Sequence, residues 1–208
     1  EQYFRKQMEL LTSAGFDALG IGSMEEPGFL REAGIELPMY FDQGMYSWNH
    51  LAGAAMERYG ADRLTIPVEL NEREIRDSGV QGEMIVYGYL PMMISAQCIR
   101  KTTLGCSGKP EIMWLKDRKD MRFPVVNQCR FCYNTIYNSA PLSLLGLSEQ
   151  VTGLKPNAVR LNFTVEEPAA AGEILDAFFE EYGMSEKAAE PPVLRNQFTR
   201  GHFKRGVE

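Results

Sequence analysis

The chain has 208 residues and a net charge of −6, with 44% hydrophobic and 24% charged residues. This length allows a domain with a substantial core, and the ordinary composition excludes a disordered or fibrous protein. The acidic balance argues against a protein that coats nucleic acid non-specifically, although a local basic cleft would still allow an enzyme to act on RNA.

The first part of the chain alternates predicted helices and strands. Helical spacing of apolar residues, with Gly and Pro at the ends, predicts helices over 4–13, 27–34, 47–59 and 72–77. Asn71 and Glu74 form a capping-box pattern at the start of the last of these helices. Short apolar runs predict strands over 17–22, 37–41, 63–68 and 83–89.

The alternation breaks at residues 98–140, which contain all four cysteines and a predicted hairpin of strands 112–115 and 123–127. The alternation then returns. Its predicted elements are a helix over 143–152, a strand over 158–164 and a helix over 168–182 that ends at Gly183. Residues 185–197 have the composition of a linker, and residues 198–208 form a basic tail.

Strands separated by helical segments predict βαβ units and a parallel sheet. The chain has room for about five such units, whereas an eight-unit barrel typically needs about 250 residues. We therefore expect a partial (β/α) TIM-like barrel that lacks its first strands and contains a cysteine-bearing insertion; an open α/β sheet is the alternative. The expected segments are 1–97, the insertion 98–140, the last β/α unit 141–184, and the linker and tail 185–208.

The sequence predicts neither a membrane span nor a signal peptide, since no apolar run approaches the roughly 20 residues needed to cross a bilayer. The chain opens at Glu1 without Met, which we interpret as a piece of a longer protein. Eleven Met and four Cys suit a reducing compartment, so we expect a cytoplasmic location. A partial barrel leaves open sheet edges, so we expect the fragment to self-associate as a dimer.

The four cysteines are Cys98, Cys106, Cys129 and Cys132. The last two form a C-x-x-C pair, whose turn can point both sulfurs at one centre. Four thiolates suit either a tetrahedral zinc or an iron–sulfur cluster, and the spacing does not choose between them. The alternative is a set of independent thiols, which we weight at about a quarter because all four fall within one short segment.

Several motifs occur in the order found in a known family. Residues 67–75 (PVELNEREI), 83–88 (EMIVYG), Cys98 with Cys106, and the closing residues 199–208 (TRGHFKRGVE) resemble the signature of the bacterial collagenase-like peptidase family U32. The resemblance implies a peptidase by name. Related members hydroxylate RNA bases or a quinone ring with an iron–sulfur cluster on four cysteines, which would make all four cysteines of this chain ligands. Tyr87 stands where the family usually has His, which indicates a divergent branch.

Residues at the expected carboxyl ends of strands are candidate site residues, because barrel enzymes place their chemistry there. His202 and the basic residues around it in the tail are further candidates, because such a patch is suited to binding phosphate. The candidate catalytic residues are Gln43, His50, Glu69 and His202, and the candidate substrate-binding residues are Asn49, Tyr87, Arg200, Lys204 and Arg205. The structural alternatives are loop hydrogen bonding for Gln43 and Asn49, a helix cap for Glu69 and a core aromatic for Tyr87. A solvated tail is the alternative for the basic residues after 199.

Three functions are consistent with these residues. The first is an iron–sulfur enzyme that modifies, for example hydroxylates, RNA or a small aromatic substrate. The second is a peptidase acting on peptides, although the sequence contains no HExxH zinc motif and only two His. The third is a non-catalytic binding module that is stabilised by zinc or by a cluster.

Overall fold

The computed structural model describes residues 2–184 and 197–206. The described chain forms two compact units. Unit 1 is built from the described parts of Glu1–Ile85, Glu149–Arg160 and Gly201–Glu208, and unit 2 from those of Val86–Ser148 and Leu161–Arg200. Among the described residues, no helix is long and apolar enough to span a bilayer. The predicted linker, apart from Gln197, lies outside the described residues.

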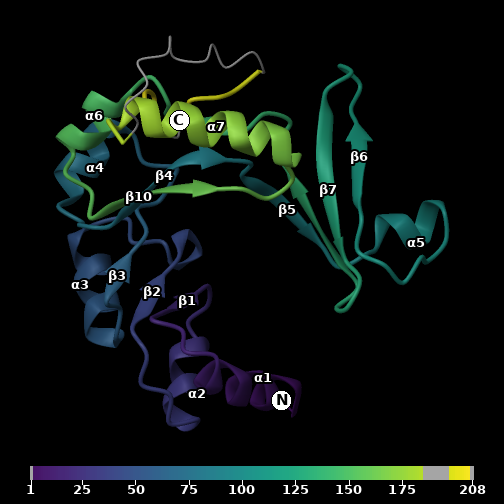
Figure 1. The fold of residues 1–208 in the computed structure, drawn as a ribbon, viewed down its shortest axis with the longest axis horizontal. Helices are drawn as coiled ribbons and strands as arrows, with labels where there is room; N and C mark the ends of the chain where they lie inside the picture. Colours follow the sequence, from purple (N-terminus) through teal and green to yellow (C-terminus); the bar gives the residue numbers. More distant parts are fainter. Residues whose placement is uncertain (1, 185–196, 207–208) are drawn as a thin grey trace. The chain divides into compact units, whose positions relative to one another are not determined.

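Unit 1 contains a parallel sheet with the strand order β1-β2-β3 (Figure 1). Its register places Gly20 beside Tyr40, and Tyr40 beside Arg63. The strands and the helices around them are α1 (Gln2–Ser13), β1 (Leu19–Ile21), α2 (Glu26–Glu32), β2 (Met39–Phe41), α3 (His50–Tyr59) and β3 (Arg63–Leu64). The predicted α/β class with parallel strands is therefore confirmed.

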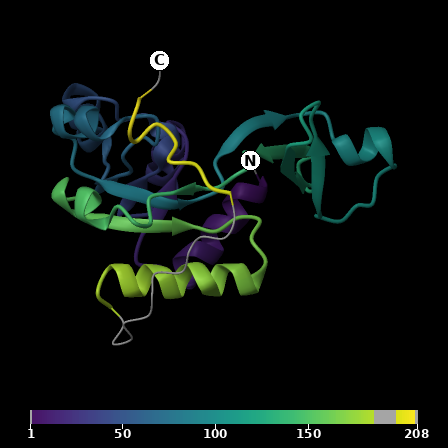
Figure 2. The ribbon, with the colours of Figure 1, turned by 90° about the horizontal axis from the view of Figure 1, so that it is seen from above.

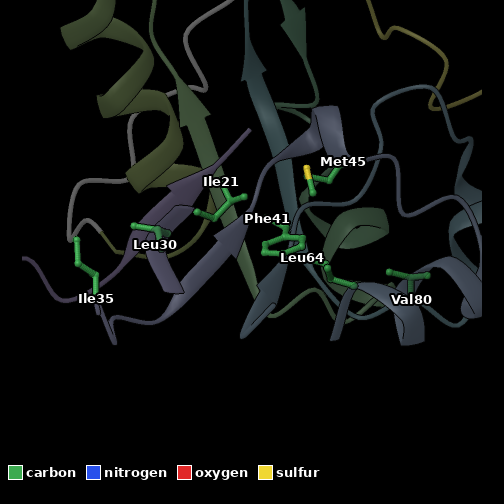
Figure 3. Close-up of a cluster of buried hydrophobic side chains, with 7 residues drawn as sticks. All are labelled: Ile21, Leu30, Ile35, Phe41, Met45, Leu64 and Val80. Atoms are coloured by element: carbon green, nitrogen blue, oxygen red, sulfur yellow. The ribbon is translucent and has the colours of Figure 1, made fainter. Parts of the chain in front are cut away.

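The core of unit 1 lies on one face of this sheet (Figure 3). Ile21, Phe41 and Leu64 come from three successive strands, and each is at most 3% exposed. Leu30 of α2 packs against them. Burying each of these side chains contributes roughly 1.5–3 kcal/mol. The apolar positions that alternate along the strands therefore hold the helices against one face of the sheet.

Helix caps in unit 1 follow the sequence pattern. The Asn49 side chain accepts a hydrogen bond from the Ala52 N–H (3.0 Å) at the start of α3, and Gly60 ends that helix with φ 119°. Helix α4 (Glu72–Ser78) has the predicted capping box, in which Asn71 Oδ1 accepts from Glu74 N–H and Glu74 accepts from Asn71 N–H. The predicted N-terminus of α4 is confirmed.

A second sheet follows, with the order β10-β4-β9. Its strands are β4 (Glu83–Gly88), β9 (Leu142–Ser143) and β10 (Ala158–Asn162), and the first three residues of both β4 and β10 belong to unit 1. After β3, Thr65 forms a parallel bridge with Glu83, and the Ile66 N–H donates to Glu83 O (2.8 Å). The described strands form no closed barrel, so the partial TIM-like barrel stays a prediction.

One predicted helix begins too early. Residues 143–147 were expected to be helical, but Leu142 and Ser143 form β9 and pair antiparallel with Gly88 and Tyr87. Helix α6 begins only at Ser148 and ends at Gly153. The predicted helix over 168–182 is present as α7 (Pro168–Glu181).

The cysteine-rich segment of unit 2 folds as a four-stranded antiparallel sheet, with the order β5-β8-β7-β6 and the short helix α5 near the start of β6 (Figures 1 and 2). The predicted hairpin is confirmed as β6 and β7, but the sequence reading missed β5, β8 and α5. The elements are β5 (Pro91–Ser95), α5 (Ile99–Thr103), β6 (Ile112–Lys116), β7 (Arg122–Gln128) and β8 (Tyr133–Tyr137).

Strand β5 is an edge strand with exposed apolar side chains; Met92, Met93 and Ile94 are 63%, 59% and 70% exposed. An apolar edge of this kind is a site for pairing with another chain. We propose that the chain self-associates through β5. We expect Ile94→Lys to reduce the mass measured by light scattering to that of a monomer, while Ile112→Lys on the opposite edge does not. A wild-type chain that stays monomeric at high concentration would contradict this proposal.

Candidate functional site

All four cysteines lie in unit 2, on the segments that join β5 to β6 and β7 to β8. Cys98 is the N-cap of α5, and its sulfur accepts from the Lys101 N–H at 3.5 Å. Cys106 lies in the exposed loop after α5. Cys129 and Cys132 occupy the turn between β7 and β8, and Cys132 has a positive φ of 55°.

The four thiols are all free, and Cys129 interacts electrostatically with the other three. Its sulfur also donates to the Lys109 carbonyl oxygen at 3.0 Å. Desolvation, followed by the charges of Cys106, Cys98, Cys132 and then Glu111, raises the pKa of the Cys129 thiol. The fold therefore places Cys129 within electrostatic range of the other three cysteines.

Two buried asparagines position the segments that contain these cysteines. Asn127 and Asn134 are directly opposite each other on β7 and β8, and they are 1% and 0% exposed. Asn134 Nδ2 donates to the carbonyl oxygen of Gln97, the residue before Cys98, at 2.8 Å. Asn127 Oδ1 accepts from the N–H of Glu111, at the end of the loop that contains Cys106. The asparagine pair thus connects both ends of the segment that contains Cys98 and Cys106 to the sheet.

An ion pair ties α5 to the loop that follows it. Arg100 Nε lies 2.6 Å from Glu111 Oε1, and Arg100 Nη1 donates to the Gly105 carbonyl oxygen at 3.0 Å. The sequence reading did not identify Arg100, Glu111, Asn127 or Asn134. The only local signal was at Asn127, a polar residue directly after the apolar run of residues 124–126, where an unpaired polar side chain would be costly.

Four free thiols form a donor set that suits zinc or an iron–sulfur cluster. In type of donor the four thiols fit such a group. Within residues 2–184 and 197–206, no three His, Cys, Asp or Glu side chains converge as a group able to hold a metal ion.

The predicted residues after β2 lie in unit 1. Gln43 begins a 3-10 turn (Gln43–Met45), and its Oε1 is buried without a hydrogen-bond partner among the described atoms. Asn49 caps α3, as its structural alternative proposed, and His50 is exposed in the first residue of that helix. Glu69 is partly buried in the turn after β3.

Unit 1 also contains a charged cluster that the sequence reading missed. Arg160 on β10 lies 2.6 Å from Asp42 Oδ1, at the end of β2, and 3.1 Å from Glu83 Oε1, at the start of β4. The Arg160 and Glu83 side chains are 29% and 17% exposed. Partly buried charges of this kind must be paired. The cluster therefore links the end of β2, the start of β4 and β10 within unit 1.

Tyr87 on β4 belongs to the core of unit 2 and is 4% exposed. Its ring centre lies 5.7 Å from that of Phe163. Burial, and after it the Glu166 carboxylate, raise the pKa of Tyr87 well above its usual range. This placement agrees with the structural alternative of a core aromatic.

The tail joins both units through different residues. In unit 2, Thr199 forms a parallel bridge with Leu142 of β9. Arg200 Nη1 donates to the carbonyl oxygens of Ser143 (2.7 Å) and Leu145 (2.6 Å), and its guanidinium lies 4.6 Å from the Phe198 ring centre. These contacts show that Arg200 fixes the tail to the sheet of unit 2.

In unit 1, Phe203 anchors the last described residues. It is 4% exposed, and its carbonyl oxygen accepts from the Glu72 N–H at the start of α4 (2.8 Å). The His202 Nδ1 lies 2.8 Å from the Gly206 carbonyl oxygen. Lys204 and Arg205 are exposed. The structure therefore separates two exposed basic residues from the anchoring residues of the same motif.

Comparison with known proteins gives a family. The model of peptidase family U32 matches residues 2–174, which is most of the chain. Searches of curated proteins and of solved structures found no significant match.

Proposed function

The chain belongs to peptidase family U32, and from that premise we propose that the protein to which it contributes is an iron–sulfur enzyme of the cytoplasm that modifies RNA or a small aromatic substrate. The observation that supports this proposal is the set of four free thiols in one neighbourhood of unit 2, with Cys129 influenced by the other three. A structural disulfide framework would pair these thiols instead.

Cys98, Cys106, Cys129 and Cys132 would hold the cluster. When bound, the cluster supplies one-electron transfer. The residues of the chain would orient it: Asn134 holds the Cys98 loop through Gln97, and Asn127 holds the Cys106 loop through Glu111. Second-shell hydrogen bonds of this kind are a general means of fixing ligand loops.

We further propose that unit 1 is part of a TIM-like barrel completed by residues outside this chain. The parallel order β1-β2-β3 and the parallel bridge from Thr65 to Glu83 at the start of β4 support this arrangement. In such a barrel the segments after β2 and β3 would contribute to the substrate site. Gln43, with its buried and unpartnered Oε1, and Glu69 are the residues we would place there.

A peptidase is the second candidate, and the family name favours it. His50 is exposed and is the residue we would assign as its base. In this case His50→Ala would abolish proteolysis by the purified protein, with His202→Ala as the second variant to compare. Proteolysis that persists in both variants would exclude these His from a peptidase mechanism.

Single Cys→Ser variants test the ligand assignment. We expect each of the four variants, purified without oxygen, to lose most of the iron that the wild type retains, because a missing thiolate leaves one iron without its protein ligand. Ser107→Ala, beside Cys106 in the same loop, is the matched control and should keep its iron. A cysteine whose replacement leaves the iron content unchanged is not a ligand.

A further inference from the structure

The segment from Cys98 to Tyr137 is basic in an otherwise acidic chain. It contains eight Lys and Arg against three Asp and Glu, a net charge of +5, whereas the whole chain has −6. The remaining residues therefore have a net charge of −11. A local charge of opposite sign on this scale attracts an anionic partner even when the net charge is negative.

The three carboxylates of this segment are already engaged. Glu111 pairs with Arg100, and Asp120 pairs with Lys116 at 2.6 Å. Asp117 Oδ1 accepts from the N–H groups of Lys119 (2.7 Å) and Met121 (2.9 Å) in the turn between β6 and β7. The basic side chains outside these ion pairs include Lys101, Lys109, Arg118, Lys119 and Arg122.

The register of the β6–β7 hairpin gathers part of this charge around an exposed indole. Trp114 is opposite Pro124 and Lys116 is opposite Arg122, so Trp114, Lys116 and Arg122 share one face. Trp114 is 54% exposed. The turn adds Arg118 and Lys119, both exposed. We call Trp114, Lys116, Arg118, Lys119 and Arg122 the hairpin patch; the hairpin is visible in Figure 1.

The same face continues toward the cysteines. Gln128 of β7 is opposite Tyr133 of β8. Gln128 lies on the same face of β7 as Pro124, because the two are four positions apart and side chains alternate between the faces of a strand. Tyr133 stacks against Phe131, with ring centres 6.4 Å apart and an angle of 24° between the rings. Phe131, which is 54% exposed, sits between Cys129 and Cys132. The Phe131–Tyr133 pair therefore lies roughly 13 Å from Trp114, measured along the direction of β7.

We propose that this face of the β6-β7-β8 sheet binds single-stranded nucleic acid. Bases would stack on Trp114 and on the Phe131–Tyr133 pair, while Arg118, Lys119 and the other cations of the patch contact phosphates. Aromatic platforms beside basic side chains bind single strands with little sequence preference. In a duplex the faces of each base are covered by the base pairs stacked above and below it, so the exposed indole favours an unpaired strand over a duplex. An acidic protein would satisfy the charge but not the two aromatic groups.

This inference deepens the proposed function, because it selects nucleic acid from the two substrate classes proposed there. It rests on that function for the reaction but not for the binding. The bound nucleic acid would approach the turn that contains Cys129 and Cys132. Binding itself needs no cluster, so it can be measured with or without one. Loss of the cluster with binding retained would count against the proposed function alone; a cluster-containing protein without binding would overturn this inference alone.

Fluorescence anisotropy with a labelled single-stranded RNA about 12 nucleotides long tests the proposal. We expect Trp114→Ala to weaken binding roughly five- to a hundredfold. The double variant Arg118→Glu with Lys119→Glu should weaken binding at least about tenfold and lower the slope of log K against log salt by about 0.7 per lost phosphate contact. Both changes are on exposed side chains, and unchanged circular dichroism would show that the variants are folded.

Two controls make the result decisive. Arg58→Glu on α3 of unit 1 changes the net charge by the same amount per residue on an exposed helix and should leave the affinity nearly unchanged. A duplex of the same length should bind more weakly than the single strand. Equal affinity for the duplex together with no effect of Trp114→Ala would overturn the proposal. So would equal weakening by Arg58→Glu and by the hairpin variants, or stronger weakening by Arg205→Glu in the tail.

Discussion

Replacing Gly88 by alanine is expected to destabilise unit 2 by about 2–5 kcal/mol. Gly88 ends β4 with φ 151°, a backbone conformation that residues with a Cβ rarely adopt. A Cβ there would lie 2.5 Å from the Asn162 carbonyl oxygen and 2.9 Å from the Asn162 Cβ. Since the first of these contacts is with backbone, relief would require β4 and β10 to separate. Urea denaturation of the wild type and the variant measures the change.

Gly172→Ala is the matched control for Gly88→Ala. Gly172 lies inside α7, and a Cβ there would meet nothing within 4 Å. We expect this variant to be more stable than the wild type by about 1 kcal/mol, because alanine is the better helix former. A Gly88→Ala variant as stable as the wild type would show that the close approach of Asn162 is not required by the fold.

The second large effect is expected at Asn134. Asn134→Ala would remove the donor to the Gln97 carbonyl oxygen and leave a void at a position that is 0% exposed. We expect a loss of about 2–3 kcal/mol in the free energy of unfolding. Because Gln97 precedes Cys98, the variant should also retain less iron than the wild type after anaerobic purification. Melting temperature and iron per chain are the two measurements.

Asn157→Ala is the control for Asn134→Ala, since Asn157 is exposed and lies in unit 1. It should change the free energy of unfolding by less than about 0.5 kcal/mol and leave the iron content unchanged. If Asn134→Ala lowers the stability but keeps full iron, the asparagine pair supports only the fold. If the Asn134→Ala variant keeps both the stability and the iron content of the wild type, the proposed positioning role of Asn134 is wrong.

Local chemistry predicted the elements whose signals are local. The capping box at Asn71, the closing Gly60 and the hairpin of β6 and β7 depend on residues a few positions apart, and the structure confirms all three. Strands β1 and β2 were also predicted, because short apolar runs between helices typify buried parallel strands. The predicted third strand is shorter than expected and ends at Leu64.

The elements that sequence reasoning missed depend on distant partners. The apolar residues Leu144, Leu145 and Leu147 suit either a helix or a buried strand, and only the pairing of β9 with β4 distinguishes them. Strand β5 begins at Pro91, and proline is tolerated at the start of an edge strand although it is otherwise a signal against a strand.

The candidate site was predicted in part. The clustering of cysteines in one segment was visible, and the structure places Cys129 in electrostatic range of the other three. The asparagine pair and the Arg100–Glu111 ion pair were not visible, because each joins residues from different strands or loops. The roles of Gln43, His50, Glu69, His202, Lys204 and Arg205 remain predictions.

Iron, acid-labile sulfide and zinc, measured together on the intact protein purified without oxygen, test the central claim most directly. We expect about four irons and four sulfides per chain, with an absorption spectrum typical of a cluster on four cysteines. One zinc and no sulfide would contradict the iron–sulfur enzyme and favour a zinc-stabilised binding module. Neither metal would contradict both and leave the peptidase, with His50 as its first candidate residue.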